Sequence, residues 1–168
     1  MTQKGFTLIE LLVVTSIILI ISSIILSDYH VGQRQFALQR AVHQLAQDLR
    51  QAEEMSMSAK SYNCPTGYKM KGYGINLPVG NDYYWLKARC ESIGAPGTYS
   101  DHVVGESIKL EKGVKILGAV PANIFFYPPD PEIDLGAAAT AQITLCSEID
   151  ITQTKTVSIN KTGLINVE

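Results

Sequence analysis

Recognisable enzyme signatures are missing from this sequence. It contains no G-x-S-x-G, HExxH, Walker A or dinucleotide-binding motif. Its histidines, His30, His43 and His102, form no spaced group with cysteines or carboxylates of the kind that binds zinc. These absences predict a protein that is not an enzyme and that needs no cofactor.

A strong charge of one sign is also missing. The chain has 14 Lys and Arg residues against 16 Asp and Glu residues, for a formal net charge of −2. A net charge this small creates no overall field that would attract nucleic acid. Any site for a polyanion must therefore be local.

Cysteine is scarce, and no C-x-x-C pair is present. In an oxidising compartment Cys64, Cys90 and Cys146 suggest one disulfide and one free thiol, and three pairings are possible. We prefer Cys64 with Cys90, because they flank a predicted hairpin; closing that loop of about 27 residues is worth roughly 3.5 kcal/mol in the chain-entropy model. Three reduced, buried cysteines are the alternative.

A long apolar run occupies residues 6–26, with Glu10 as its one charged residue. As a helix, these residues span roughly 31 Å, the thickness of a bilayer core. Lys4 precedes the run and Asp28 follows it, so the positive-inside rule predicts a cytoplasmic N-terminus with the remainder outside. No A-x-A-like cleavage triplet follows, which disfavours a secretory signal peptide. The run is predicted to be a single membrane span.

Glu10 needs a separate explanation, because a charged side chain in a membrane segment is costly. One explanation is that the carboxylate extends toward water at the nearby interface. The other is a functional partner, and this segment contains none.

The stretch KGFTLIELLVVTSIILIISSII resembles the leader and N-terminal helix of type IV pilins and type II secretion pseudopilins. It has a short basic leader ending in Gly5, then Phe6 as the first mature residue and Glu10 four residues later. The resemblance implies that prepilin peptidase cuts after Gly5 and that the new amine of Phe6 is N-methylated. It also implies that Glu10 meets the Phe6 amine of a neighbouring subunit, each charge offsetting the burial of the other.

The same resemblance implies a location and a set of partners. The chain is expected to be a single-pass protein of the inner membrane, with its head outside the cytoplasm, before it enters a pilus or pseudopilus filament. Its implied partners are other pilins, contacted through the N-terminal helix, the prepilin peptidase and methylase, and the inner-membrane assembly platform.

The sequence that follows the predicted membrane span indicates a helix and then a series of strands. Apolar residues recur at steps of three and four from Leu38 to Ala52, which marks one face of an amphipathic helix. No proline interrupts residues 6–64, and Cys64-Pro65 should end the helix. Beyond Pro65 the period changes to two, with seven or eight short strands and with predicted loops at residues 91–102 and 127–140.

We therefore predict an α+β, pilin-like fold, in which a long N-terminal helix packs on an antiparallel β head. The predicted parts are a leader at 1–5, a transmembrane or filament-core helix at 6–28, an amphipathic helix at 29–64 and the head at 65–168.

The later stretches IFFYPPD, ITLCS and KTVSINKTGLINV resemble the end of minor H-type pseudopilins and FimT-like pilins. This implies a minor subunit in the priming or tip complex of a type IV pilus or type II secretion pseudopilus. Some FimT-like pilins act in natural transformation through a basic C-terminal region, so a DNA-uptake pilin is the alternative. This sequence departs from that pattern, because Lys155 and Lys161 are its only basic residues after Gly118.

The first predicted hairpin offers another candidate surface for DNA. A turn symmetric about Val79 would place Lys71 opposite Lys87, and Lys69 opposite Arg89. Like charges in these positions repel unless an anionic partner or nearby acids relieve them. Cations interleaved with aromatic rings suit single-stranded nucleic acid, so the candidate residues are Lys69, Lys71, Trp85, Lys87 and Arg89. In the alternative, the rings pack on the helix and the cations extend into solvent.

Asp130, Glu132 and Asp134 alternate beside three prolines and offer the hard oxygen ligands that calcium prefers. Their spacing lacks the glycine and the terminal glutamate of an EF-hand loop. We favour an exposed acidic loop with no bound metal.

Overall fold

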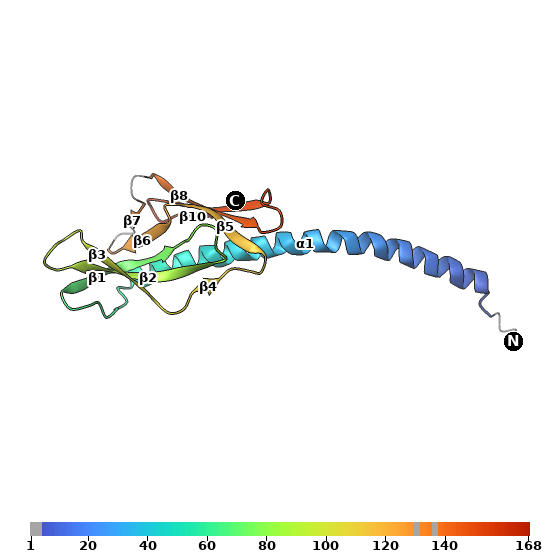
Figure 1. Cartoon of the computed structure of the whole chain (residues 1–168), viewed down its shortest axis with the longest axis horizontal. Helices are drawn as coiled ribbons and strands as arrows, with labels where there is room; N and C mark the ends of the chain where they lie inside the picture. The colour runs from blue at the N-terminus through green and yellow to red at the C-terminus, as the bar shows by residue number, and fades with distance from the viewer. Residues whose placement is uncertain (1–4, 130–131, 136–137) are drawn as a thin grey trace. The chain divides into compact units, whose positions relative to one another are not determined.

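The computed structural model describes residues 5–129, 132–135 and 138–168, with the backbone alone for residues 26–31 and 132 (Figure 1). The chain divides into two compact units, residues 1–36 and residues 37–168, and we call the second unit the head. Among the described residues there are one helix, α1 (Leu8–Met57), which contributes to both units, and ten strands, which all lie in the head.

The helix ends at Met57 rather than at the predicted residue 64. Ala59 has a φ of 49°, the left-handed conformation that commonly follows a helix. The backbone N–H of Lys60 donates to the carbonyl of Met55 at 3.1 Å, which satisfies one of the last free carbonyls of α1. The sequence misplaced this end because proline was the only stop signal considered, and alanine gives no such signal.

The predicted apolar stripe of α1 forms one side of the core of the head. Its members are no more than 4% exposed: Leu38, Val42, Leu45, Leu49 and Ala52. One turn further on, the Ser56 hydroxyl accepts a hydrogen bond at 2.8 Å from the backbone N–H of Tyr73 on β1. The second half of α1 is therefore packed against the β structure, as the spacing predicted.

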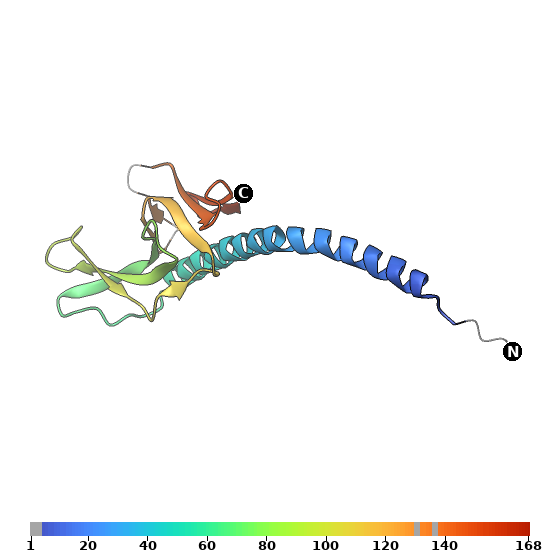
Figure 2. The same cartoon turned by 45° about the vertical axis from the view of Figure 1, so that its right-hand side comes forward.

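The strands form two antiparallel sheets (Figure 2). The first has the order β3-β2-β1-β6-β7 with β4 also on β2, and the second has the order β10-β9-β8-β5. The strands of the first sheet are β1 (Tyr68–Asn76), β2 (Tyr83–Ser92), β3 (Tyr99–Val103), β4 (Ile108–Lys109), β6 (Asn123–Tyr127) and β7 (Glu132–Asp134). Those of the second are β5 (Val114–Val120), β8 (Thr140–Ser147), β9 (Thr154–Asn160) and β10 (Ile165–Val167).

These elements confirm the predicted α+β, pilin-like fold class. Each predicted strand segment overlaps a strand of the structure, but β3 and β7 lie in stretches that were predicted to be loops. Both are edge strands of the first sheet. An edge strand needs little apolar alternation, because it pairs on one side only. The sequence also gave no sign that the strands separate into two sheets.

The observed register between β1 and β2 overturns the predicted pairing of like charges. The register skips Lys71, so this residue does not face Lys87. Lys69 lies opposite Glu91 rather than opposite Arg89. Next to the turn, Asn76 already lies opposite Trp85, so the hairpin is not symmetric about Val79. A β-bulge at Lys71 then shifts the pairs beyond it by one residue.

Gly72 and Gly74 follow the bulge, so β1 carries no side chain at these two positions. A Cβ atom added to Gly74 would overlap the carbonyl oxygen of Ile124 and the ring of Phe125 on the neighbouring β6. Gly72 lies opposite Arg89 on the other neighbouring strand, β2. Side chains from β2 and β6 can therefore meet across β1.

Candidate functional site

The predicted processing site is exposed. The Phe6 side chain is 84% exposed. Gly5, directly before it, is exposed as well. The peptide bond that the prepilin peptidase would cut is therefore accessible in the described part of the chain. The rest of the predicted leader, residues 1–4, lies outside the described residues.

Glu10 takes part in the N-terminal cap of α1. Its Oε2 atom accepts hydrogen bonds from the backbone N–H of Thr7 at 2.9 Å and from the Thr7 hydroxyl at 2.8 Å. In return, the Thr7 Oγ1 atom accepts a hydrogen bond from the backbone N–H of Glu10 at 3.3 Å. This reciprocal arrangement is a capping box. Thr7 was not among the predicted site residues, although T-L-I-E before an apolar run is itself the signal for such a cap.

The helix that follows has the properties of a membrane span. Leu8–Ile25 has a mean hydropathy of 2.7, and none of it is buried within the chain. Its large apolar side chains, among them Leu12, Ile17 and Ile21, are at least half exposed. A helix that is apolar on all sides is suited to lipid or to other apolar helices rather than to water.

Phe6 and Glu10 lie on the same face of this segment. Together with Ile9, Val13 and Val14 they line a shallow groove of about 350 Å³. Glu10, Val13 and Val14 share one face of α1 because residues three and four apart are neighbours on a helix surface, and Phe6 lies just before the first helical residue, Leu8. The carboxylate predicted to act in assembly thus borders an otherwise apolar groove.

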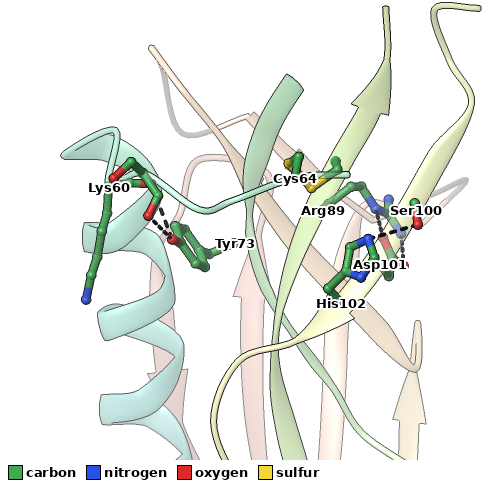
Figure 3. The surroundings of a disulfide bond; sticks show 9 residues. Lys60, Cys64, Tyr73, Arg89, Ser100, Asp101 and His102 are labelled. Carbon is green, nitrogen blue, oxygen red and sulfur yellow. Dashed lines mark hydrogen bonds and ion pairs between the residues drawn. A yellow bond between two sulfur atoms is a disulfide. The ribbon is translucent and has the colours of Figure 1, made fainter. Parts of the chain in front are cut away.

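In the head, Cys64 and Cys90 form a disulfide, with their Cα atoms 5.9 Å apart (Figure 3). This is the pairing preferred from the sequence, and it ties the segment after α1 to β2. Cys146 is a free, buried thiol. Burial raises the pKa of Cys146, which keeps the thiol protonated and unreactive.

Two of the cations proposed for DNA binding share one carboxylate. The Nζ atoms of Lys69 and Lys71 lie 3.4 and 3.6 Å from Oε2 of Glu91, whose side chain is only 8% exposed. The backbone N–H of Gly97 also donates to Glu91, at 3.2 Å. That hydrogen bond lowers the pKa of Glu91, burial opposes it, and the two lysines lower the pKa further.

Arg89, another of the cations proposed for DNA binding, is surrounded by acidic and aromatic side chains. Its Nε and Nη2 atoms donate to the carboxylate of Asp101 at 2.7 and 2.9 Å. Its Nη1 atom donates to Asp134 at 3.0 Å and to the hydroxyl of Tyr127 at 2.9 Å. Burial lowers the pKa of Arg89, but the hydrogen bonds to Asp101 and Tyr127 outweigh it, and the net shift is upward. Figure 3 shows Arg89 and Asp101 in contact.

Trp85 and Lys87 lie apart from these acids. The Trp85 ring packs edge to face on the ring of Tyr83, with the centroids 4.8 Å apart. Lys87 forms no ion pair with any described residue. The five residues proposed to bind nucleic acid therefore do not form one continuous cationic surface, because three of their four cations are in ion pairs with acidic side chains.

The calcium candidates are only partly described. Asp134 accepts hydrogen bonds from Arg89 and Tyr127. Asp130 and the side chain of Glu132 lie outside the described residues. In the part of the chain that the structure describes, no group of three or more His, Cys, Asp or Glu side chains is placed to hold a metal ion.

Comparison with known proteins bears on the N-terminal segment alone. Residues 1–26 match the family model of the prokaryotic N-terminal methylation motif. No curated protein and no solved structure matches the chain. This N-terminal methylation motif, on an apolar helix that continues into an antiparallel β head, supports the resemblance to type IV pilins and pseudopilins.

Proposed function

We propose that the protein is a minor, non-enzymatic subunit of a type IV pilus or a type II secretion pseudopilus, acting in its priming or tip complex. The observation that carries the proposal is the arrangement at the start of α1. There an exposed Gly5-Phe6 bond precedes an apolar helix whose first turn contains one carboxylate, Glu10.

Cleavage after Gly5 would leave the apolar helix attached to the mature protein, so the helix would serve first as a membrane anchor and then as part of a filament core. The new amine of Phe6 would stand at the N-terminus of a helix, where the helix dipole disfavours a positive charge. A neighbouring carboxylate would offset this cost. Glu10 is suited to this role in a second subunit, because burial of either charge alone is costly.

Before assembly, the capping box gives Glu10 a partner within its own chain. The two hydrogen bonds from Thr7 reduce the cost of holding a carboxylate beside the bilayer. In the filament the Phe6 amine of a neighbour would add a charge-assisted partner, which is stronger than a neutral one. Glu10 would thus have a hydrogen-bond partner at both stages.

The disulfide supports a head outside the cytoplasm. Disulfides persist in oxidising compartments such as the periplasm and are rare in the cytosol. Cys64 and Cys90 both lie in the head. This agrees with the orientation that Lys4 predicts by the positive-inside rule. Prepilin peptidase and the inner-membrane assembly platform would then act on the N-terminal segment, and other pilins would contact α1.

DNA capture is the weaker alternative. It would need a cationic surface, and Glu91, Asp101 and Asp134 form ion pairs with three of the four candidate cations of the first hairpin. We therefore assign the head to assembly contacts rather than to nucleic acid.

The test is mass spectrometry of the N-terminus of the full-length protein recovered from membranes and from sheared filaments. We expect a peptide that begins with N-methylated Phe6 in both fractions. Recovery of a Glu10→Ala variant in sheared filaments should fall sharply, while Glu54→Ala, an exposed change on the same helix, should leave recovery unchanged. An intact Met1 or a cut beyond Leu26 would contradict the proposal.

A further inference from the structure

Two exposed isoleucines mark the turn between β8 and β9. Ile149 is 71% exposed and Ile151 is 58% exposed. Two acids, Glu148 and Asp150, alternate with them. We call these four residues the isoleucine turn. The turn therefore exposes two apolar side chains, and a residue with a carboxylate precedes each of them.

The isoleucine turn lies at the end of the head where α1 enters. The backbone N–H of Glu148 donates to the carbonyl of Gly113 at 2.9 Å, which places the turn beside the connection between β4 and β5. Glu111 in that connection forms an ion pair with Arg40 of α1, with 3.6 Å between Nε and Oε1.

A cavity of about 260 Å³ lies at the other end of the head, where α1 finishes. Met55 of α1 contributes to its lining and follows Arg40 by 15 residues of helix, or about 22 Å. The apolar part of the lining includes Met55, Met70, Tyr73 and Pro128, and the two lysines of the lining are Lys60 and Lys71. In Figure 3 the Lys60 amine points away from Tyr73 and clear of the strands.

We propose that the isoleucine turn of one copy of this chain docks into the cavity of a second copy. The cavity is smaller than the roughly 300–1,000 Å³ of most small-molecule sites, so it is better matched to one or two side chains of a protein. Its apolar lining suits an isoleucine. The exposed Glu148 carboxylate beside the isoleucines can meet the exposed Lys60 amine beside the cavity, so the two surfaces are also complementary in charge; Lys71 is already paired with Glu91.

This contact would be heterologous, because the two surfaces differ and lie at opposite ends of the head. A heterologous contact repeats from copy to copy, and it forms an open, helical assembly unless the rotation closes a ring. The inference goes beyond the proposed function by naming a contact between heads. It rests on that function only for holding copies in the same membrane or filament.

The contact is too small to hold two free heads together. Stable interfaces bury about 800 Å² on each partner, far more than a single turn provides. Anchoring both copies by their N-terminal helices raises their effective concentration, so that a weak contact can form. The test therefore uses full-length protein in membranes.

Two differently tagged copies would be expressed together, one with Ile149→Cys and the other with Ser61→Cys, and the membranes would then be oxidised. Ser61 lines the cavity and is exposed. Leu164→Cys replaces Ile149→Cys in the control pair; Leu164 is a 56% exposed apolar residue on a different turn. We expect at least about 10-fold more mixed disulfide dimer from the Ile149→Cys pair than from the control pair.

Charge reversal provides a second readout that leaves both cysteines in place. Adding Glu148→Lys to the turn copy should lower the dimer yield about fivefold, the upper range for an exposed ion pair. Adding Lys60→Glu to the cavity copy should then restore the yield. Both positions are exposed, so neither change should affect folding.

The outcomes separate the two proposals. Equal yields from the Ile149→Cys and Leu164→Cys pairs would overturn the docking, and so would a Ser61→Cys copy that joins a protein of different mass. Methylated Phe6 without the mixed dimer would overturn the docking alone. A chain that is unprocessed at Gly5 would contradict the proposed function, and the dimer yield would still decide the docking.

Discussion

The guanidinium carbon of Arg89 lies 3.6 Å from the centroid of the Phe125 ring. Arg89 belongs to β2 and Phe125 to β6, and β1 runs between these strands. The two side chains meet because β1 presents Gly72 and Gly74 at this point. The same guanidinium binds Asp101 on β3 and Asp134 on β7, the two edge strands. One side chain therefore joins both edges of the sheet to its centre.

Removal of this guanidinium should destabilise the head. We expect Arg89→Met to lower the free energy of unfolding by about 2–3 kcal/mol, because it removes the cation paired with Asp101 and one of the partners of Asp134. The estimate is below that for a fully buried pair, since the Asp134 side chain is 40% exposed. Urea unfolding of the detergent-solubilised chain, followed by Trp85 fluorescence, measures the change. Lys87→Met on the same strand should cost less than about 0.5 kcal/mol, and an equal cost at both positions would contradict this role for Arg89.

Gly74→Ala should destabilise the head by about 1–3 kcal/mol or more, the usual range for an overpacked site. Its Cβ would overlap the Ile124 carbonyl and the Phe125 ring, and neither the strand nor the ring beneath Arg89 can move freely. Gly94→Ala is the control, because a Cβ there meets nothing within 4 Å. Thermal unfolding of the two variants compares them, and a Gly74→Ala protein as stable as Gly94→Ala would refute the close packing across β1.

The pairing of Glu91 with Lys69 and Lys71 should make stability depend on pH. The pKa of Glu91 in the folded chain is below its ordinary value of 4.5. Its ionised form therefore contributes stability above pH 4.5 that is lost as the pH falls through the folded-state pKa. Wild type should be more stable than Glu91→Gln at pH 7, and the difference should shrink toward acid pH. Glu54→Gln, an exposed change, should show little difference at any pH; a constant gap for Glu91→Gln would contradict the linkage.

Thr7→Ala should loosen the first turn of α1. The hydroxyl both donates to and accepts from Glu10, and loss of an N-cap side chain typically costs about 1 kcal/mol. Hydrogen exchange at the amide of Glu10, which donates to the Thr7 hydroxyl, should then accelerate about fivefold in lipid nanodiscs. Thr7→Ser keeps the hydroxyl and should restore slow exchange. Fast exchange in the serine variant would show that the hydroxyl is not what holds the turn.

The intact protein should bind single-stranded DNA no more tightly than the usual non-specific range of about 10⁻⁴ to 10⁻⁶ M at physiological salt. Glu91 pairs with both Lys69 and Lys71 and offsets one of their two charges, and Arg89 is held by two acids. Removing the acid with Glu91→Gln should tighten binding and steepen its salt dependence. Tight, salt-sensitive binding by the wild type would instead restore the DNA-uptake hypothesis.

The sequence by itself determined the N-terminal segment and the helix stripe. Membrane length, the positions of Gly5, Phe6 and Glu10, and the spacing of Leu38 to Ala52 are local properties that depend on chain order and helix period alone. For the same reason most of the strands were predicted, since alternation along one strand is also local.

Only the tertiary structure decided how the head uses its charges. The hairpin is not centred on Val79 and β1 has a bulge at Lys71, and together they place Glu91 opposite Lys69, where a second cation had been predicted. Asp101 and Asp134 reach Arg89 from strands that the sequence did not reveal. Likewise, the isoleucine turn and the cavity are far apart in the chain, and their placement at opposite ends depends on how both sheets pack on α1. Such relations depend on long-range register and packing, which no local pattern encodes.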